Sequence, residues 1–230
     1  MINGAEVDSA PLSFIQTNIK IRNVVKMMYV VSDTHFFDEH LLGIDNFAPR
    51  PFDSVDEMNK TIINNWNSRV TNDDIVYHLG DIAVNYTKPP RVGDQQVLSV
   101  LRKLNGRLVL IKGNHDRRDL FKFLASHNYQ VAGHPKFEFH DVGKLIKYNH
   151  MQLYMTHYPM MMGIAPQILN LHGQIHHYMV PSANNINVGI DAPELTLLDH
   201  HLPFGTPILL REVDYIAQKK VELLKNKQNK

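Results

Sequence analysis

Short apolar runs that end in polar, ligand-type residues constrain the fold of this chain more than any other feature. The run Arg107-Leu108-Val109-Leu110-Ile111 is short, apolar and branched, which predicts a buried strand. It is followed by Gly113-Asn114-His115-Asp116, which brings an amide, an imidazole and a carboxylate onto one turn. Open α/β sheets bind their ligands beyond the carboxyl ends of the strands. We therefore expect a functional site at that edge of a sheet.

Four further polar clusters follow other predicted strands. They are Asp33-x-His35 after residues 27–31, Gly80-Asp81 after 75–79, His157 after 151–155, and Gly173-Gln174-Ile175-His176 after 168–171. In an extended segment alternate side chains point the same way, so Asp33 and His35 could reach one ion. The clusters supply carboxylates, imidazoles and amides but no thiolates, because the chain has no cysteine. This ligand set suits divalent manganese, iron, nickel or zinc.

The first half of the chain alternates strands and helices. A capping-box pattern at Ser54 and Glu57 precedes a predicted helix that carries Trp66 on its apolar face. A second helix is predicted over residues 97–104, stopped by Asn105-Gly106, and a third over 119–125. The order strand, helix, strand, helix, strand predicts a parallel α/β half.

The second half changes to short strands with tight connections. Strands are predicted at residues 137–139, 144–148, 151–155, 168–171 and 186–190, and a closing helix at 210–224. We expect the two halves to pack as two sheets of one domain over residues 27–230. Residues 1–26 are expected to form a partly disordered N-terminal extension in which residues 14–21 could add a strand.

Composition narrows the classes of function. The chain has 230 residues, 43% hydrophobic and 20% charged, as in ordinary soluble globular proteins. The absence of cysteine excludes disulfides and a thiol nucleophile, and fits a cytoplasmic location. No apolar run is long enough to span a membrane, and no secretion signal is predicted, so no membrane partner is expected. The formal net charge of +1 predicts weak long-range attraction to nucleic acid.

The motifs together resemble those of the calcineurin-like metallophosphoesterases, especially small bacterial and phage members. The most similar phrases are Val31-Ser32-Asp33-Thr34-His35, His78-Leu79-Gly80-Asp81 and Thr156-His157-Tyr158-Pro159, and all five clusters follow the order of the family. The resemblance implies an α/β fold of the family's kind, a four-layer α/β/β/α sandwich with two mixed sheets. It also implies a metal-dependent hydrolase of phosphodiesters or phosphomonoesters, a phosphodiesterase or a phosphatase.

The resemblance also implies roles for individual residues. A first metal ion would be held by Asp33, His35, Asp81 and His176, and Asp81 would bridge to a second ion held by Asn114, His157 and residue 174. A hydroxide activated by both ions would attack phosphorus. His115, with Asn114, would bind the phosphate, and His115 would protonate the leaving oxygen. Manganese is the favoured ion, with iron, nickel and zinc as alternatives.

Two residues after His115 have supporting interpretations. Asp116 is expected to orient an imidazole or the loop from behind the ligands. Arg117 could contact the substrate phosphate, because a guanidinium suits that geometry, or it could simply begin a solvated helix. The other histidines have no partner pattern. Of these, His78 is expected to be packed or bonded to backbone, whereas His172 and His177 could reach a substrate.

One position departs from the family pattern. The family has Gly-His-x-His where this chain has Gly173-Gln174-Ile175-His176, so an amide replaces an expected imidazole. Three interpretations stay open: a weakly bound second ion, compensation by His172 or His177, or impaired catalysis. We favour a retained fold with an altered second metal site.

The expected substrate is a phosphate ester, either a small molecule or a nucleotide. Two alternatives remain beside the phosphoesterase. One is a catalytically impaired protein that binds a phosphorylated ligand, which Gln174 supports. The other is a nuclease, which the near-neutral charge disfavours because phosphate contacts dominate binding to nucleic acid.

Overall fold

The computed structural model describes residues 26–43, 47–163 and 165–228, which form two stacked mixed sheets. The five-stranded sheet has the order β11 (Ile208–Leu209), β1 (Met28–Val31), β2 (Ile75–His78), β3 (Arg107–Ile111), β6 (Phe137–His140). Only β11 is antiparallel to its neighbour. The four-stranded sheet has the order β10 (Asn185–Asn187), β9 (Ile168–His172), β8 (Met151–Thr156), β7 (Gly143–Tyr148). In this sheet only the β7–β8 pair is antiparallel.

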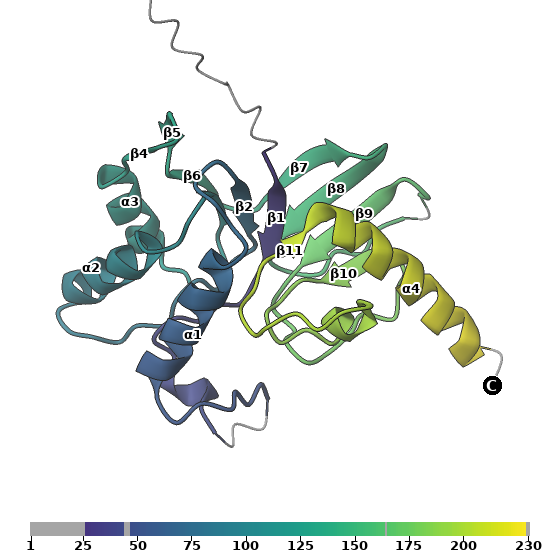
Figure 1. Cartoon of the computed structure of the whole chain (residues 1–230), viewed down its shortest axis with the longest axis horizontal. Coiled ribbons are helices and arrows are strands. Elements are labelled where there is room, and N and C mark those ends of the chain that lie inside the picture. Colours follow the sequence, from purple (N-terminus) through teal and green to yellow (C-terminus); the bar gives the residue numbers. More distant parts are fainter. Residues whose placement is uncertain (1–25, 44–46, 164, 229–230) are drawn as a thin grey trace, which may run out of the picture.

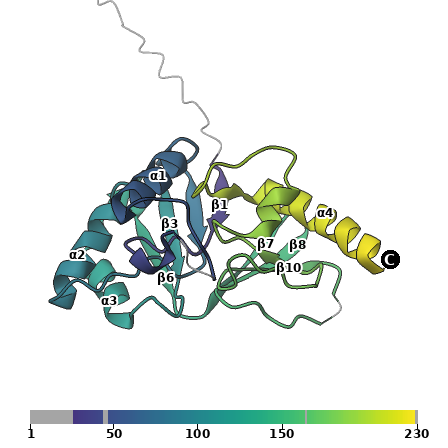
Figure 2. The ribbon, with the colours of Figure 1, turned by 90° about the horizontal axis from the view of Figure 1, so that it is seen from below.

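Helices enclose the pair of sheets (Figures 1 and 2). α1 (Val55–Asn67), α2 (Pro90–Leu101) and α3 (Arg118–Ser126) cover the outer face of the five-stranded sheet. α4 (Leu210–Gln228) lies on the far side of the molecule, against the short 3-10 segment η2 (Pro193–Leu197). A second 3-10 segment, η1 (Glu39–Leu41), follows β1. The predicted α/β class with two mixed sheets is confirmed.

Alternation along the strands divides the core into two layers. In β3, Leu108 and Leu110 pack toward α1–α3, whereas Val109 and Ile111 pack between the two sheets. Side chains on both faces of β3 are thus buried, as expected for a parallel strand covered on both faces. The two core layers hold β3 in place, and the loop that begins at Lys112 follows directly from the end of this strand.

The start of α1 follows from its sequence. The Ser54 hydroxyl accepts a hydrogen bond from the Glu57 amide at 3.2 Å, and the Glu57 carboxylate accepts one from the Asp53 amide at 3.1 Å. This is the predicted cap, with the return bond made one residue earlier than in the usual box. Trp66, near the end of α1, is fully buried, and its Nε1 donates to the Asn105 carbonyl at 3.1 Å.

Several boundaries differ from the prediction. α2 ends at Leu101, four residues before the predicted stop, because Leu104 reaches the core from a turn. β10 ends at Asn187, after which Gly189 bridges to Ser32 next to β1. The sequence pattern places residues 137–139 with the later strands, but β6 pairs in parallel with β3. β11 and the small hairpin of β4 (Gln130–Val131) and β5 (His134–Pro135) were not predicted, because two-residue strands carry no periodic signal.

The predicted extension, including the possible strand at residues 14–21, lies outside the described residues except for residue 26. The division into residues 1–26 and 27–230 therefore stays a prediction. Among the residues that the structure describes, no helix is long and apolar enough to cross a membrane.

Candidate metal centre

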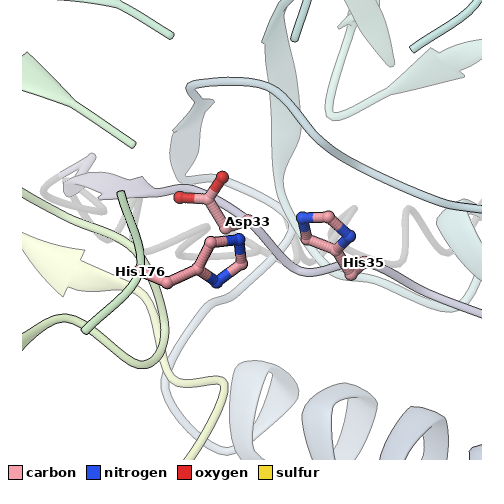
Figure 3. A group of neighbouring side chains, drawn as sticks. All are labelled: Asp33, His35 and His176. Carbon is pink, nitrogen blue, oxygen red and sulfur yellow. The ribbon is translucent and has the colours of Figure 1, made fainter. Parts of the chain in front are cut away.

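The carboxyl ends of β1, β2, β3, β8 and β9 meet at one edge of the stacked sheets, and the predicted ligands lie there. Two groups of side chains have ligand atoms within 4.8 Å of one another: Asp33 with His35 and His176, and Asp33 with Asp81 and His157. All of these side chains are buried. Figure 3 shows the first group gathered between the segment after β1 and the loop that carries His176. Clusters far apart in the sequence are thus brought together.

The backbone at these residues is strained. Asp33, His35, Asp81, Gln174 and His176 all have positive φ, between 44° and 73°. A non-glycine residue in such a region costs on the order of 1–3 kcal/mol, and such strain concentrates at functional sites. The surrounding structure must therefore hold these residues in place.

A buried arginine supplies part of that hold. Arg50 donates to the carbonyls of Asp33 at 2.6 Å and Thr34 at 2.8 Å, and its guanidinium pairs with Asp191 at 3.0 Å. Both charged side chains are buried, so each compensates the desolvation of the other. Sequence reasoning missed Arg50 and Asp191. Asp191 directly follows the predicted strand at 186–190, as the other clusters follow theirs, and that position could have identified it.

Glycine is required where the loops approach each other. A Cβ on Gly113 would lie 2.2 Å from Asp81 Oδ1, and one on Gly173 would lie 2.0 Å from Ser32 Oγ. Real side chains do not tolerate such distances. These two glycines therefore allow the loops after β3 and β9 to bring their polar residues close to Asp33 and Asp81.

Two histidines are oriented from behind by carboxylates. Nδ1 of His35 lies 2.9 Å from Asp38 Oδ2, and Nδ1 of His176 lies 3.0 Å from Asp191 Oδ2. Each contact leaves Nε2 directed elsewhere, and His35 Nε2 is buried without a hydrogen-bond partner among the described residues. A histidine whose second nitrogen bonds a carboxylate is the usual arrangement of a metal ligand. Asp38, which sequence reasoning also missed, is only three residues from His35.

His157 faces an unusual set of oxygens. Its Nδ1 lies 2.8 Å from the Leu79 carbonyl, to which it donates. Its Nε2 lies 2.8 Å from Asn114 Oδ1, 2.7 Å from Gln174 Oε1 and 3.3 Å from Asp81 Oδ2. A neutral imidazole that donates through Nδ1 presents only a lone pair at Nε2. Four acceptors then converge, and a cation among them, either a proton or a metal ion, satisfies all four. The residues present therefore fit a divalent ion.

Electrostatics shows how these histidines behave without metal. Burial opposes protonation of His157, but the Asp81 carboxylate raises the pKa of the imidazole to about 9. Burial likewise opposes protonation of His35, and Asp38 and Asp81 raise its pKa to about 9. Burial would raise the pKa of Asp81, yet His157 and His35 hold it well below its usual range. Without metal, both imidazoles are therefore protonated at neutral pH.

Metal loading should accordingly release protons. At pH 7.5 we expect about two protons per chain, from His35 and His157, because ligating imidazoles must be neutral. Release should fall toward zero as the pH rises through 9, and metal affinity should rise over the same range. Calorimetric titration in buffers of different ionisation enthalpy measures this number. Release near zero at pH 7.5 would contradict the assignment of both rings.

The residues after β3 lie at the rim of the centre. The His115 ring is 5.3 Å from the His35 ring and exposed, and its amide donates to Asp81 Oδ1 at 2.8 Å. Asp116 is buried and accepts from the amides of Asp81, Ile82 and Gly113 at 2.8–2.9 Å. Asp116 therefore ties the loops after β2 and β3 together. Arg117 forms an ion pair with Asp94 of α2.

The remaining histidines of the motifs lie apart from the two groups. His78 is fully buried and bonded to the Thr34 hydroxyl at 2.9 Å. His172 is also fully buried, with Nδ1 at 2.9 Å from the Gly173 carbonyl. His177 is exposed and bonded to the Asp191 carbonyl. Neither His172 nor His177 belongs to either ligand group, so the structure gives no support to compensation for Gln174.

Replacing Asp191 by asparagine tests the orientation of His176. We expect metal affinity to fall about 10–100-fold, as for other partners of ligating histidines. Thermal stability should also fall, because Arg50 loses its buried partner. Metal titration and thermal denaturation separate the two effects, and Glu212→Gln, which removes a partner of Arg69 away from the centre, is the control. Lower stability with unchanged metal affinity would contradict a role in orienting His176.

The chain is similar to a known protein family and to individual known proteins. The family model described as calcineurin-like phosphoesterase matches residues 28–224. The uncharacterized protein MJ1445 of Methanocaldococcus jannaschii is 33% identical over 144 residues, which covers 59% of this chain and 75% of the relative. The Gene 66 protein of Mycobacterium phage L5 is 28% identical over 192 residues, covering 71% and 86%.

A solved structure shares the fold. The crystal structure of AQ665 from Aquifex aeolicus, a protein of unknown function, matches with a TM-score of 0.55 and 22% identity. The match covers 83% of this chain and 98% of that one. The family model spans all of the strand ends that carry the ligand groups, from Asp33 to His176. The chain belongs to the calcineurin-like phosphoesterase family.

Proposed function

We propose that this protein is a metal-dependent phosphoesterase with two ion sites that share Asp81. Asp33, His35, Asp81 and His176 would hold one ion, and Asp81, Asn114, His157 and Gln174 the other. The convergence of three oxygens on His157 Nε2 carries this proposal, because a second cation satisfies all four acceptors. Manganese is the proposed ion, since the donor set mixes carboxylate, imidazole and amide groups.

The two ions, when bound, would acidify a shared water and neutralise the phosphoryl oxygens. The residues of the chain supply the remaining steps. Asn114 directs Oδ1 toward His157, which leaves its amide NH₂ free to donate to a phosphoryl oxygen. His115 is exposed at the rim, where it can give a proton to the leaving oxygen. Such general-acid assistance typically contributes about 10²–10⁴-fold in rate.

The substrate we propose is a phosphate ester of a small molecule or nucleotide. Arg117 is engaged by Asp94, so it contributes less to phosphate binding than a free guanidinium would. A nuclease remains an alternative that the net charge of +1 disfavours. The second candidate, an impaired phospho-ligand-binding protein, rests on Gln174 alone. The cytoplasm is the proposed compartment, on the absence of cysteine.

Hydrolysis of generic esters tests the proposed function. The protein is stripped with chelator, reloaded with manganese, nickel, iron or zinc, and assayed on p-nitrophenyl phosphate and bis(p-nitrophenyl) phosphate. We expect turnover of at least one ester that depends on added metal and disappears again with chelator. Tight binding of phosphate without turnover would favour the binding protein instead. The absence of both turnover and phosphate binding with all four ions would overturn the proposal.

A further inference from the structure

A cavity leads away from the metal centre beside His115. Asn114 and His115 line a space of about 230 Å³ together with Asn85 and Tyr86. Asn85 and Tyr86 also line a larger space of about 690 Å³, which continues toward His40. The shared residues make the two spaces neighbours. We call the two spaces together the path. The leaving group, whose oxygen His115 would protonate, would therefore extend into this path.

An aromatic side chain stands where the two spaces meet. Tyr86 is 72% exposed, and its ring meets that of His40 edge to face with centroids 5.9 Å apart. Phe37 lines the larger space as well. Exposed aromatic faces in a ligand cavity bind planar rings well, because stacking tolerates many ring types.

The segment that carries Tyr86 is held in place. Asn85 Oδ1 accepts from the Thr87 amide at 2.9 Å, and Asn85 Nδ2 donates to Gln96 of α2 at 2.9 Å. The Thr87 hydroxyl also donates to Gln96, at 3.1 Å. Gly93 leaves room for this packing, since a Cβ there would lie 3.1 Å from Asn85 Oδ1. Tyr86 is therefore carried on a segment anchored to α2 before any substrate binds.

The charges along the path are acidic or paired. Arg117 and Asp94 neutralise each other, and Glu39 and Asp56 line the larger space, where His40 is the only basic side chain among the described residues. A phosphate or carboxylate on the leaving group would be repelled here. The next cavity, between α1 and α2, does contain Lys60 and Lys103. The repulsion therefore applies to the part of the leaving group that reaches the larger space beyond Tyr86, before this next cavity.

We propose that this path is the leaving-group pocket and that it selects esters of planar alcohols that carry no negative charge on the side remote from the scissile bond. Tyr86 would stack on the ring, and Glu39 and Asp56 would exclude anionic groups. The inference rests on the proposed phosphoesterase function, and it names the substrate class of the same site. A nucleoside or aryl alcohol satisfies the requirement, whereas an aryl alcohol with a carboxylate on its far side does not.

Matched esters test the role of Tyr86. Benzyl and cyclohexylmethyl esters, in whichever ester class the manganese-loaded protein hydrolyses, differ in planarity but little in size. Tyr86→Ala should lower kcat/KM for the benzyl ester about tenfold and that for the cyclohexylmethyl ester less than about twofold. Tyr86→Phe should retain the preference. Equal effects on both esters would overturn the proposal.

Charge reversal tests the acidic lining. Glu39→Lys with Asp56→Lys should raise the ratio of 4-carboxybenzyl to benzyl ester hydrolysis about tenfold. Glu39→Gln with Asp56→Asn should raise the same ratio by a smaller factor. Asp73→Lys, exposed at the opposite edge of the sheet, is the control. If the ratio changes no more in the charge-reversed variant than in the control, the proposed leaving-group pocket is wrong, but the phosphoesterase function is unaffected. Failure of the wild type on every ester, p-nitrophenyl esters included, would overturn the proposed function with it.

Discussion

Replacing Asp81 by asparagine is expected to lower phosphoester hydrolysis about 10³-fold or more and to remove at least one bound ion. Asp81 Oδ2 lies 3.5 Å from His35 Nε2 and 3.3 Å from His157 Nε2, so it stands between the two proposed ion sites. Loss of its charge weakens both sites at once. Metal ions contribute several kcal/mol of charge stabilisation in the transition state, and about 4 kcal/mol corresponds to 10³-fold.

Asparagine is the informative substitution because it keeps the shape of the side chain. Its carbonyl can still accept the 2.8 Å hydrogen bond from the His115 amide, and it fits the close approach of Gly113. Activity is measured as kcat/KM at saturating manganese, and metal content by elemental analysis. Glu138→Gln, which removes a carboxylate of β6 outside both ligand groups, should change neither by more than about twofold. If the variant retains two ions and its activity stays within tenfold of wild type, Asp81 does not bridge the two ion sites.

The residues of this centre were predictable wherever the signal was local. β1, β2 and β3 are short apolar runs, and their polar clusters follow within a few residues, so parallel pairing alone brings the clusters together. Gly113 and Gly173 belong to the predicted polar clusters, and the structure shows how closely the loops meet there. The fold class followed from the same alternation of strands and helices.

The supporting layer was not predictable in the same way. Arg50 and Asp191 pair across 141 residues, and Arg50 contacts only backbone atoms of Asp33 and Thr34. No spacing rule connects such positions. β6 shows a related limit: alternation in Phe137-Glu138-Phe139 predicts a strand, but its choice of sheet depends on α3 crossing over to bring it beside β3. Local pattern therefore identifies elements and candidate ligands, while long-range partners emerge only in the folded chain.

Gln174→His is expected to raise affinity for the second ion about 10–100-fold, because imidazole is a better transition-metal ligand than an amide oxygen. The position is prepared for the exchange. Gln174 Oε1 already lies 2.7 Å from His157 Nε2, and its backbone amide bonds the Asp33 carboxylate at 3.1 Å whatever the side chain. The φ of 73° at this residue is one that histidine adopts more readily than most residues.

The concentration of metal decides what this substitution reveals about function. At limiting manganese, activity should rise in proportion to second-site occupancy, whereas at saturating manganese wild type and variant should converge. Gln174→Ala is the matched control, and it should bind the second ion more weakly than wild type because no oxygen replaces Oε1. Equal affinity in all three proteins would exclude residue 174 as a ligand.

A large gain in turnover with histidine means that glutamine leaves an enzyme with a weakened site. Full occupancy by two ions without any gain, together with tight binding of inorganic phosphate, means that the centre serves binding rather than hydrolysis.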